Sequence, residues 1–192
     1  MYICGMITRE RLKGGYSEGE ALAIYMEVKD ANDFRNFATQ FMHDEDYQIA
    51  RNAIWGLTKA TDEELSKLQP MLHDFIDLAL TTGNSSVRRL SLNIVERLVI
   101  QEDDLRTDFY DFCFEHMLDV NELPGIQSLC MKLAYRMSSF YPELRSELVR
   151  AVKDIETEYY KPAVISVRKR ILSGKLTHYA SHRTPKARNQ SE

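Results

Sequence analysis

Residues 85–98 read SSVRRLSLNIVERL. The apolar residues of this stretch follow the spacing i, i+3, i+7, i+8 and i+11, and they are Val87, Leu90, Ile94, Val95 and Leu98. This spacing places all five side chains on one side of an α-helix, as a stripe that faces a core. The stretch therefore predicts an amphipathic helix.

The same stripe recurs along the chain at intervals of 38 or 39 residues. Copies begin at Ile49, Val87 and Ile126, and an incomplete fourth copy begins at Val164. A repeat of this length is typical of stacked helical units, in which each unit buries its apolar face against its neighbours. The chain is therefore predicted to be a helical repeat array.

Each of the three complete copies is followed by a second apolar stripe. The stripes comprise Leu72, Phe75, Ile76, Ala79 and Leu80; Leu105, Phe109, Phe112, Cys113 and Met117; and Leu144, Leu148, Ala151, Val152 and Ile155. Residues 17–29 and 32–42 favour a divergent helix pair before the first copy. Thr61 and Glu64 indicate a capping box, and Pro70 either kinks the following helix or begins a separate one. We expect about four helix pairs and one closing helix.

The quoted stretch and its copies resemble the first helix of HEAT repeats, and the resemblance covers residues 45–175. It implies an all-α, right-handed α-α superhelix of the HEAT and armadillo type, in which the second helices line the concave surface. Residues 124–172 are similar to the end of small bacterial HEAT-like proteins without a settled function. A remoter similarity is to the HEAT-like DNA-alkylation-repair fold, but one Trp and acidic second helices depart from its basic, aromatic cleft.

The 192 residues are predicted to form one domain with two extensions. Residues 17–176 are assigned to the repeat domain, residues 1–16 to a poorly ordered N-terminal extension, and residues 177–192 to a basic disordered tail. Eight Gly and five Pro are too few for the many turns of an all-β fold. Because three cysteines lack ligand spacing and no apolar run approaches the ~20 residues of a membrane span, we expect a cytoplasmic protein.

No motif for catalysis, nucleotide binding or metal binding is present in the sequence. The acidic run after His43 is interpreted as a solvated turn, and His178 with His182 as an incidental pair in the tail. Trp55 is interpreted as a packing residue. The sequence therefore predicts a non-enzymatic protein with no cofactor and no metal.

The most informative functional signal is a division of charge between the two sets of helices. We call the helix predicted by each copy of the first stripe a first helix, and the helix that follows it a second helix. The first helices carry nine more basic than acidic residues, whereas the second helices carry twelve more acidic than basic ones. If the second helices line a concave face, that face attracts a basic protein or peptide. The residues predicted to bind such a partner are Asp74, Asp77, Asp108, Asp111, Glu115 and Glu147.

Two alternatives remain open at this point. The acidic residues could simply be the solvated sides of amphipathic helices. The chain could also be a nucleic-acid-associated protein that binds phosphates through its last helix and tail. The phosphate-binding candidates are Arg168, Lys169, Arg170 and Lys175. We expect a monomer or weak dimer, because the closing helix has a polar outer side.

Overall fold

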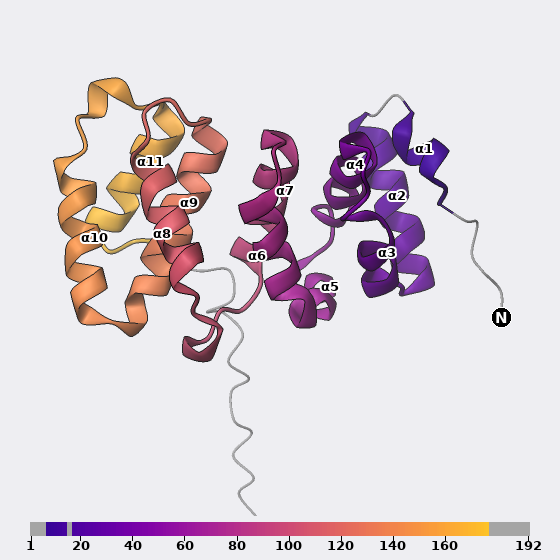
Figure 1. Cartoon of the computed structure of the whole chain (residues 1–192), viewed down its shortest axis with the longest axis horizontal. Helices are drawn as coiled ribbons and strands as arrows, with labels where there is room; N and C mark the ends of the chain where they lie inside the picture. Colours follow the sequence, from indigo (N-terminus) through magenta and orange to yellow (C-terminus); the bar gives the residue numbers. More distant parts are fainter. Residues whose placement is uncertain (1–6, 15–16, 177–192) are drawn as a thin grey trace, which may run out of the picture.

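The computed structural model describes residues 7–14 and 17–176, and these residues form helices and turns without a strand. Figure 1 shows the helices arranged in one row, from the N-terminal end of the chain at one side to the last helices at the other. The predicted tail, with His178 and His182, lies outside the described residues. The all-helical repeat architecture predicted from the 38- to 39-residue period is confirmed.

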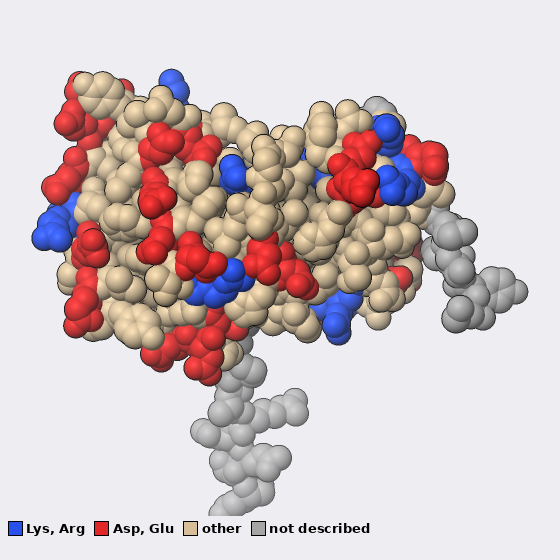
Figure 2. All heavy atoms as spheres, viewed as in Figure 1, with Lys and Arg blue, Asp and Glu red and all other residues tan. Residues whose placement is uncertain are grey.

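The helices form two layers. The first helices are α4 (Tyr47–Leu57), α7 (Ser85–Arg97), α9 (Pro124–Met137) and α11 (Pro162–Leu172), and α2 (Glu18–Ala31) extends their row at the N-terminal end. The second helices are α3 (Phe34–Phe41), α6 (Leu72–Thr81), α8 (Thr107–Leu118) and α10 (Pro142–Asp154). Within residues 17–176 these helices make up four pairs and a closing helix, as expected, and α1 and α5 are additional short helices of the described residues. In the view of Figure 2, acidic side chains lie over α8.

Second helices pack mainly against the first helix that follows them in the chain. Helix α6 packs extensively on α7, and α8 on α9, whereas α8 makes little contact with the preceding α7. The loops explain this preference, because residues 82–84 and 119–123 are short, whereas residues 98–106 form a longer connection. The tightest helical hairpins therefore straddle the boundaries of the sequence repeat. One continuous hydrophobic core runs through both layers.

Two arginines, 39 positions apart, join consecutive first helices. Arg97 on α7 and Arg136 on α9 lie at equivalent positions in their repeats. Their guanidinium groups donate hydrogen bonds to main-chain oxygens at the end of the preceding first helix: Arg97 to Thr58 and Ala60, and Arg136 to Glu96 and Leu98. These oxygens have no partner within their own helix and carry the negative end of its dipole, so a cation is favoured there.

A second set of side-chain donors caps the ends of the second helices. Each donor lies on the next first helix, and the hydrogen bonds run from Arg88 to the oxygens of Ala79 and Thr82, from Gln127 to Asp119, and from Arg168 to Val152 and Lys153. Arg88 and Gln127 are again 39 positions apart. Polar residues at fixed positions of the repeat therefore fix the relative positions of successive helices.

The N-terminal region departs from the expectation of a poorly ordered extension. Residues 9–13 form a short helix, α1 (Arg9–Lys13), which packs on α4. Leu12 is fully buried, and its main-chain oxygen accepts a hydrogen bond from the Asn52 side chain at 2.6 Å. Residues 9–13 are thus packed on the repeat array, whereas the division into a domain and two extensions stays a prediction. A five-residue helix is too short to show a periodic stripe, so its tertiary contacts are not visible in the sequence.

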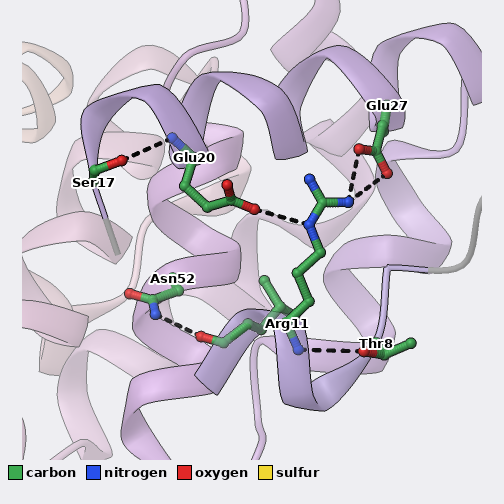
Figure 3. Close-up of polar contacts among 7 residues, drawn as sticks. Thr8, Arg11, Ser17, Glu20, Glu27 and Asn52 are labelled. Atoms are coloured by element: carbon green, nitrogen blue, oxygen red, sulfur yellow. Dashed lines mark hydrogen bonds and ion pairs between the residues drawn. The ribbon is translucent and has the colours of Figure 1, made fainter. Parts of the chain in front are cut away.

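Arg11 holds α1 against α2, as Figure 3 shows. Its Nε donates to Glu20 at 2.8 Å, and its Nη1 contacts both carboxylate oxygens of Glu27, at 2.7 and 2.8 Å. The hydrogen bonds to Glu20 and Glu27 raise the pKa of the guanidinium. Ser17 caps the start of α2 by accepting a hydrogen bond from the main-chain N–H of Glu20. Charged side chains and one cap thus order the start of the array.

The capping box of Thr61 and Glu64 is confirmed at the start of α5 (Asp62–Leu65). Pro70 lies in a 3₁₀ turn, η1 (Ser66–Met71), and α6 begins after it as a separate helix. The Glu64 carboxylate also accepts a hydrogen bond from Tyr25 and pairs with Lys29 at 3.1 Å. Burial raises the pKa of Glu64, but the hydrogen bonds from Thr61, Tyr25 and Lys29 outweigh it and lower the pKa to about 2.

Replacing the buried arginine should destabilise the array. The Arg136→Met substitution keeps much of the apolar stem but leaves the oxygens of Glu96 and Leu98 without their donor. We expect a loss of about 3 kcal/mol in unfolding free energy, since each hydrogen bond from a charged group contributes roughly 1.5–3 kcal/mol. Urea denaturation measures the loss. The control is Arg150→Met, because Arg150 is exposed on α10 and should change stability by less than about 0.5 kcal/mol. Equal effects would contradict the capping role.

The Glu64 interactions predict a specific dependence on pH. A carboxyl group whose pKa is lowered on folding stabilises the protein above its unfolded pKa and loses that contribution as the pH falls. Glu64→Gln should therefore lower the melting temperature at pH 7, and its difference from the parent chain should shrink between about pH 4.5 and about pH 2. The exposed neighbour Glu63, changed to Gln, is the control. A pH-independent difference would argue against an ionised capping box.

Candidate functional site

The second-helix layer contains a pocket between α8 and α10. From α8 the lining residues lie at positions i, i+3, i+4 and i+7, which share one side of the helix, and α10 contributes its N-terminal turns. The pocket has a volume of about 420 Å³ and is lined by Leu105, Thr107, Tyr110, Asp111, Phe114, Tyr141, Leu144 and Glu147. We call it the α8–α10 pocket. Its walls are mainly aromatic and aliphatic, and two carboxylates belong to its lining.

A second hollow lies at the opposite ends of the same two helices. It has a volume of about 380 Å³ and is lined by Leu118, Val120, Ala151, Asp154, Ile155, Glu156, Tyr159 and Tyr160. Val120 and Tyr159 are large apolar side chains that stay exposed, at 50% and 61% of their surface. The two hollows together are named the α8–α10 furrow. The lining of each hollow is mainly apolar, and each also includes two acidic residues.

A stacked arginine lies between α10 and α9 beside the pocket. The guanidinium carbon of Arg145 is 3.6 Å from the centre of the Tyr135 ring. One of its nitrogens, Nη1, is buried and has no hydrogen-bond partner among the described residues. Leu144 and Ala151 on the same helix are only half-buried, although their spacing predicts core positions. These two residues line the furrow instead.

Tyr110 is the most unusual residue of the pocket. Only 7% of its surface is exposed, and its hydroxyl has no hydrogen-bond partner among the described groups. Its ring stacks against Phe114 with centroids 6.0 Å apart. Burial, followed by the charges of Glu147 and Asp111, raises the pKa of Tyr110 to about 12. A buried hydroxyl without a partner costs about 1–3 kcal/mol, so such groups usually have a ligand, a water or a functional reason.

The two carboxylates of the pocket are exposed and unpaired. Asp111 comes from α8 and Glu147 from α10, and within the described ranges neither makes an ion pair. Figure 2 shows that acidic side chains gather over α8 and along the α10 edge of the molecule. The sequence-predicted residues Asp111 and Glu147 are therefore brought together from successive repeats.

Two other members of the predicted acidic set are already neutralised by an arginine. Arg106 pairs with Asp108 at 2.7 Å and also with Asp77 on α6. The Arg106 guanidinium lowers the pKa of Asp108, and the same contacts raise the pKa of Arg106. This bridge joins α6 to α8. Asp77 and Asp108 are therefore less available to a partner than Asp111 and Glu147.

The remaining predicted residues lie apart from the pocket. Asp74 on α6 and Glu115 on α8 are exposed, and neither lines it. Of the phosphate-binding candidates, Arg168 is used to cap α10, whereas Lys169, Arg170 and Lys175 are exposed on or after α11. Of the six acidic candidates, two therefore line the pocket, two are paired with Arg106, and two lie apart from both.

Sequence reasoning missed the aromatic residues of the pocket. Tyr110 and Phe114 lie outside the apolar stripe assigned to their helix, and Tyr141 precedes α10. The available signal was the spacing of four between Tyr110 and Phe114, which adds a second apolar side to the helix. A helix with two apolar sides contacts two neighbours or leaves one side open.

Other candidate chemistry is sparse in the described part of the chain. Cys113 and Cys130 are buried, free thiols that contact each other, and burial raises the pKa of Cys113. Within residues 7–14 and 17–176, no group of three or more His, Cys, Asp or Glu side chains could hold a metal ion. No helix in these ranges is long and apolar enough to span a membrane.

The repeat period, the two layers and the inter-repeat caps define a helical repeat protein. A family model described as a HEAT repeat domain matches residues 8–175. The chain therefore belongs to the HEAT repeat domain family. HEAT repeats generally mediate protein–protein interaction, and the family is typically non-catalytic. Comparisons with curated proteins and with solved structures gave no match.

Removing the unpaired hydroxyl should stabilise the protein. We expect Tyr110→Phe to raise the unfolding free energy by about 1 kcal/mol, because it removes a buried polar group that has no partner. The matched control is Tyr160→Phe, since the Tyr160 hydroxyl donates to the Leu118 oxygen at 2.7 Å. That substitution should destabilise by about 1 kcal/mol. Urea denaturation of both variants gives the test, and a loss of stability in Tyr110→Phe would show that the hydroxyl is paired.

Proposed function

We propose that this chain is a non-enzymatic adaptor that binds a basic segment of a partner protein along the α8–α10 furrow. The observation that carries the proposal is the pair of exposed, unpaired carboxylates, Asp111 and Glu147, beside a partly apolar pocket. A furrow of this kind offers apolar contact along its base and charge complementarity at its edges. Extended binding surfaces built from consecutive repeats are the usual means by which helical repeat proteins bind partners.

The dimensions of the furrow suit a short peptide segment. Helix α8 has 12 residues, which corresponds to about 18 Å of length. An extended segment of five or six residues covers this distance at about 3.3 Å per residue. Hollows at both ends of the furrow provide two places for side chains, and exposed Val120 and Tyr159 add apolar surface at one of them.

The electrostatics favour a cationic partner over a phosphate-bearing one. At the furrow the acidic groups Asp111, Glu147, Asp154 and Glu156 belong to the lining. Their charges attract basic segments and repel phosphates over roughly a Debye length, which is about 8 Å at physiological ionic strength. Steering of this kind raises association rates and weakens with salt.

Charge reversal tests the proposal directly. The full chain, immobilised and incubated with extract of its native cells, should retain basic proteins, and the double variant Asp111→Lys/Glu147→Lys should retain at least tenfold less of them. Quantitative mass spectrometry of the retained proteins measures the change. The control is Asp30→Lys, because Asp30 is exposed on α2 and carries the same type of charge far along the chain from the furrow.

Besides a full chain that retains no basic protein, three outcomes would contradict the proposal. One is retention that the double reversal leaves unchanged, and another is an equal loss in the Asp30→Lys control. The third is salt-sensitive binding of a DNA duplex that is lost on changing Lys169 and Arg170 to Ala but kept by the double reversal. That last result would favour the nucleic-acid-associated alternative, in which exposed cations on α11 bind phosphates.

A further inference from the structure

We infer that the α8–α10 pocket is a receptor site for a single arginine side chain of the partner protein. This inference rests on the proposed function and deepens it, because it names the chemical group that the furrow recognises. The pocket combines aromatic walls, two carboxylates and the unpaired Tyr110 hydroxyl.

The walls of the pocket suit the planar, weakly hydrated guanidinium group. Tyr110, Phe114 and Tyr141 supply three aromatic rings, and Leu105 and Leu144 supply aliphatic surface. Arginine stacks on aromatic faces and packs its methylene stem on apolar surface. The chain itself shows this chemistry next to the pocket, where Arg145 lies 3.6 Å from the Tyr135 ring centre.

Three polar groups of the pocket, the carboxylates of Asp111 and Glu147 and the Tyr110 hydroxyl, can accept hydrogen bonds. Asp111 and Glu147 approach from α8 and α10, and neither has an ion-pair partner in the described ranges. The Tyr110 hydroxyl is more than nine-tenths buried and unpaired. A guanidinium group carries five N–H donors in a plane and can serve two carboxylates and a phenol oxygen together, whereas an ammonium group carries three donors on one atom.

The charges that surround the pocket leave it available for a cation. The charged residues of its lining are Asp111 on α8 and Glu147 on α10. Arg145 on α10 is not part of the lining, but its charge lowers the pKa of Tyr110, opposite to the two carboxylates. Arg106 precedes α8, but its guanidinium is already held by Asp77 and Asp108. Within the described residues the lining therefore contains two carboxylates and no Lys or Arg, and it carries a net negative charge.

The pocket is large enough to admit an arginine side chain. Its volume of about 420 Å³ lies near the lower end of the 300–1,000 Å³ typical of ligand sites. An apolar side chain would leave the Tyr110 hydroxyl without a partner and would desolvate Asp111 and Glu147 without pairing them, which is unfavourable. An acidic side chain would face Asp111 and Glu147. Arginine is the side chain that satisfies both the walls and the acceptors.

A capped peptide, acetyl-Gly-Gly-Arg-Gly-Gly-amide, is the direct probe. Titrated at low salt into the isotope-labelled full chain, it should cause saturable amide chemical-shift changes centred on the first turns of α8 and α10. The analogue with citrulline has nearly the same shape without the charge, and it should bind at least tenfold more weakly. The lysine analogue should bind at least threefold more weakly than the arginine peptide.

Variants of the pocket separate the named contacts from general attraction. Glu147→Gln and Asp111→Asn should each weaken binding of the arginine peptide at least fivefold, and Tyr110→Phe about threefold. The control Asp74→Asn removes an exposed second-helix acid that does not line the pocket, and it should change the dissociation constant less than twofold. Because all of these variants keep the shape of the side chain, unchanged amide spectra away from the pocket verify folding.

The inference is overturned by equal binding of the citrulline peptide, by lysine binding as tight as arginine binding, or by an Asp74→Asn effect equal to that of Glu147→Gln. Its failure is distinguishable from failure of the proposed function. If retained basic partners are lost in Asp111→Lys/Glu147→Lys but persist in Tyr110→Phe and Glu147→Gln, the furrow binds the partner without an arginine in this pocket. If no basic partner is retained at all, the proposed function itself falls.

Discussion

Successive repeats of this protein are joined by arginines that cap the carbonyl ends of neighbouring helices. In a linear array each repeat contacts only its neighbours, so every interface must fix its own geometry. Arg97 and Arg136 do so by donating to main-chain oxygens of the previous first helix. The apolar stripes supply most of the favourable burial free energy but little direction, because the hydrophobic effect is not directional. The arginine hydrogen bonds supply direction, and they align the first helices in one row.

In the second-helix layer of the described ranges, polar contacts join α6 to α8 but not α8 to α10. The candidate site lies at the second of these steps. Arg106 bridges α6 and α8 through Asp77 and Asp108. Among the described residues no hydrogen bond or ion pair joins α8 to α10 themselves, and the two hollows lie between them. A hydrogen bond at this step comes from Tyr160, beyond the end of α10, whose hydroxyl donates to the Leu118 oxygen. Arg145 turns instead toward Tyr135 on α9. An array that is fixed along one layer can therefore leave its other layer open for a partner without losing its overall order.

Much of the fold was predictable because its determinants are local or periodic. The stripe from Val87 to Leu98 and its copies predicted the first helices, and Thr61 with Glu64 predicted a helix start that the structure confirms. Helix α1 was not predictable, since it owes its position to Arg11 and to the Asn52 side chain, whose partners lie up to 40 positions away in the chain. The sequence also could not distinguish the roles of the acidic residues. Asp108 and Asp111 lie on the same predicted helix, but among the described residues only Asp108 forms an ion pair, with Arg106.

The sequence by itself determined the all-helical repeat, the placement of most helices and the excess of acidic residues on the second set. These follow from spacing and composition, which act within one turn or one repeat. Only the tertiary structure decided which acids are neutralised, that α8 and α10 leave a furrow, and that the Tyr110 hydroxyl is buried there without a partner. The physical reason is that pairing and burial depend on the distance between side chains of different helices, and no one-dimensional pattern contains that distance.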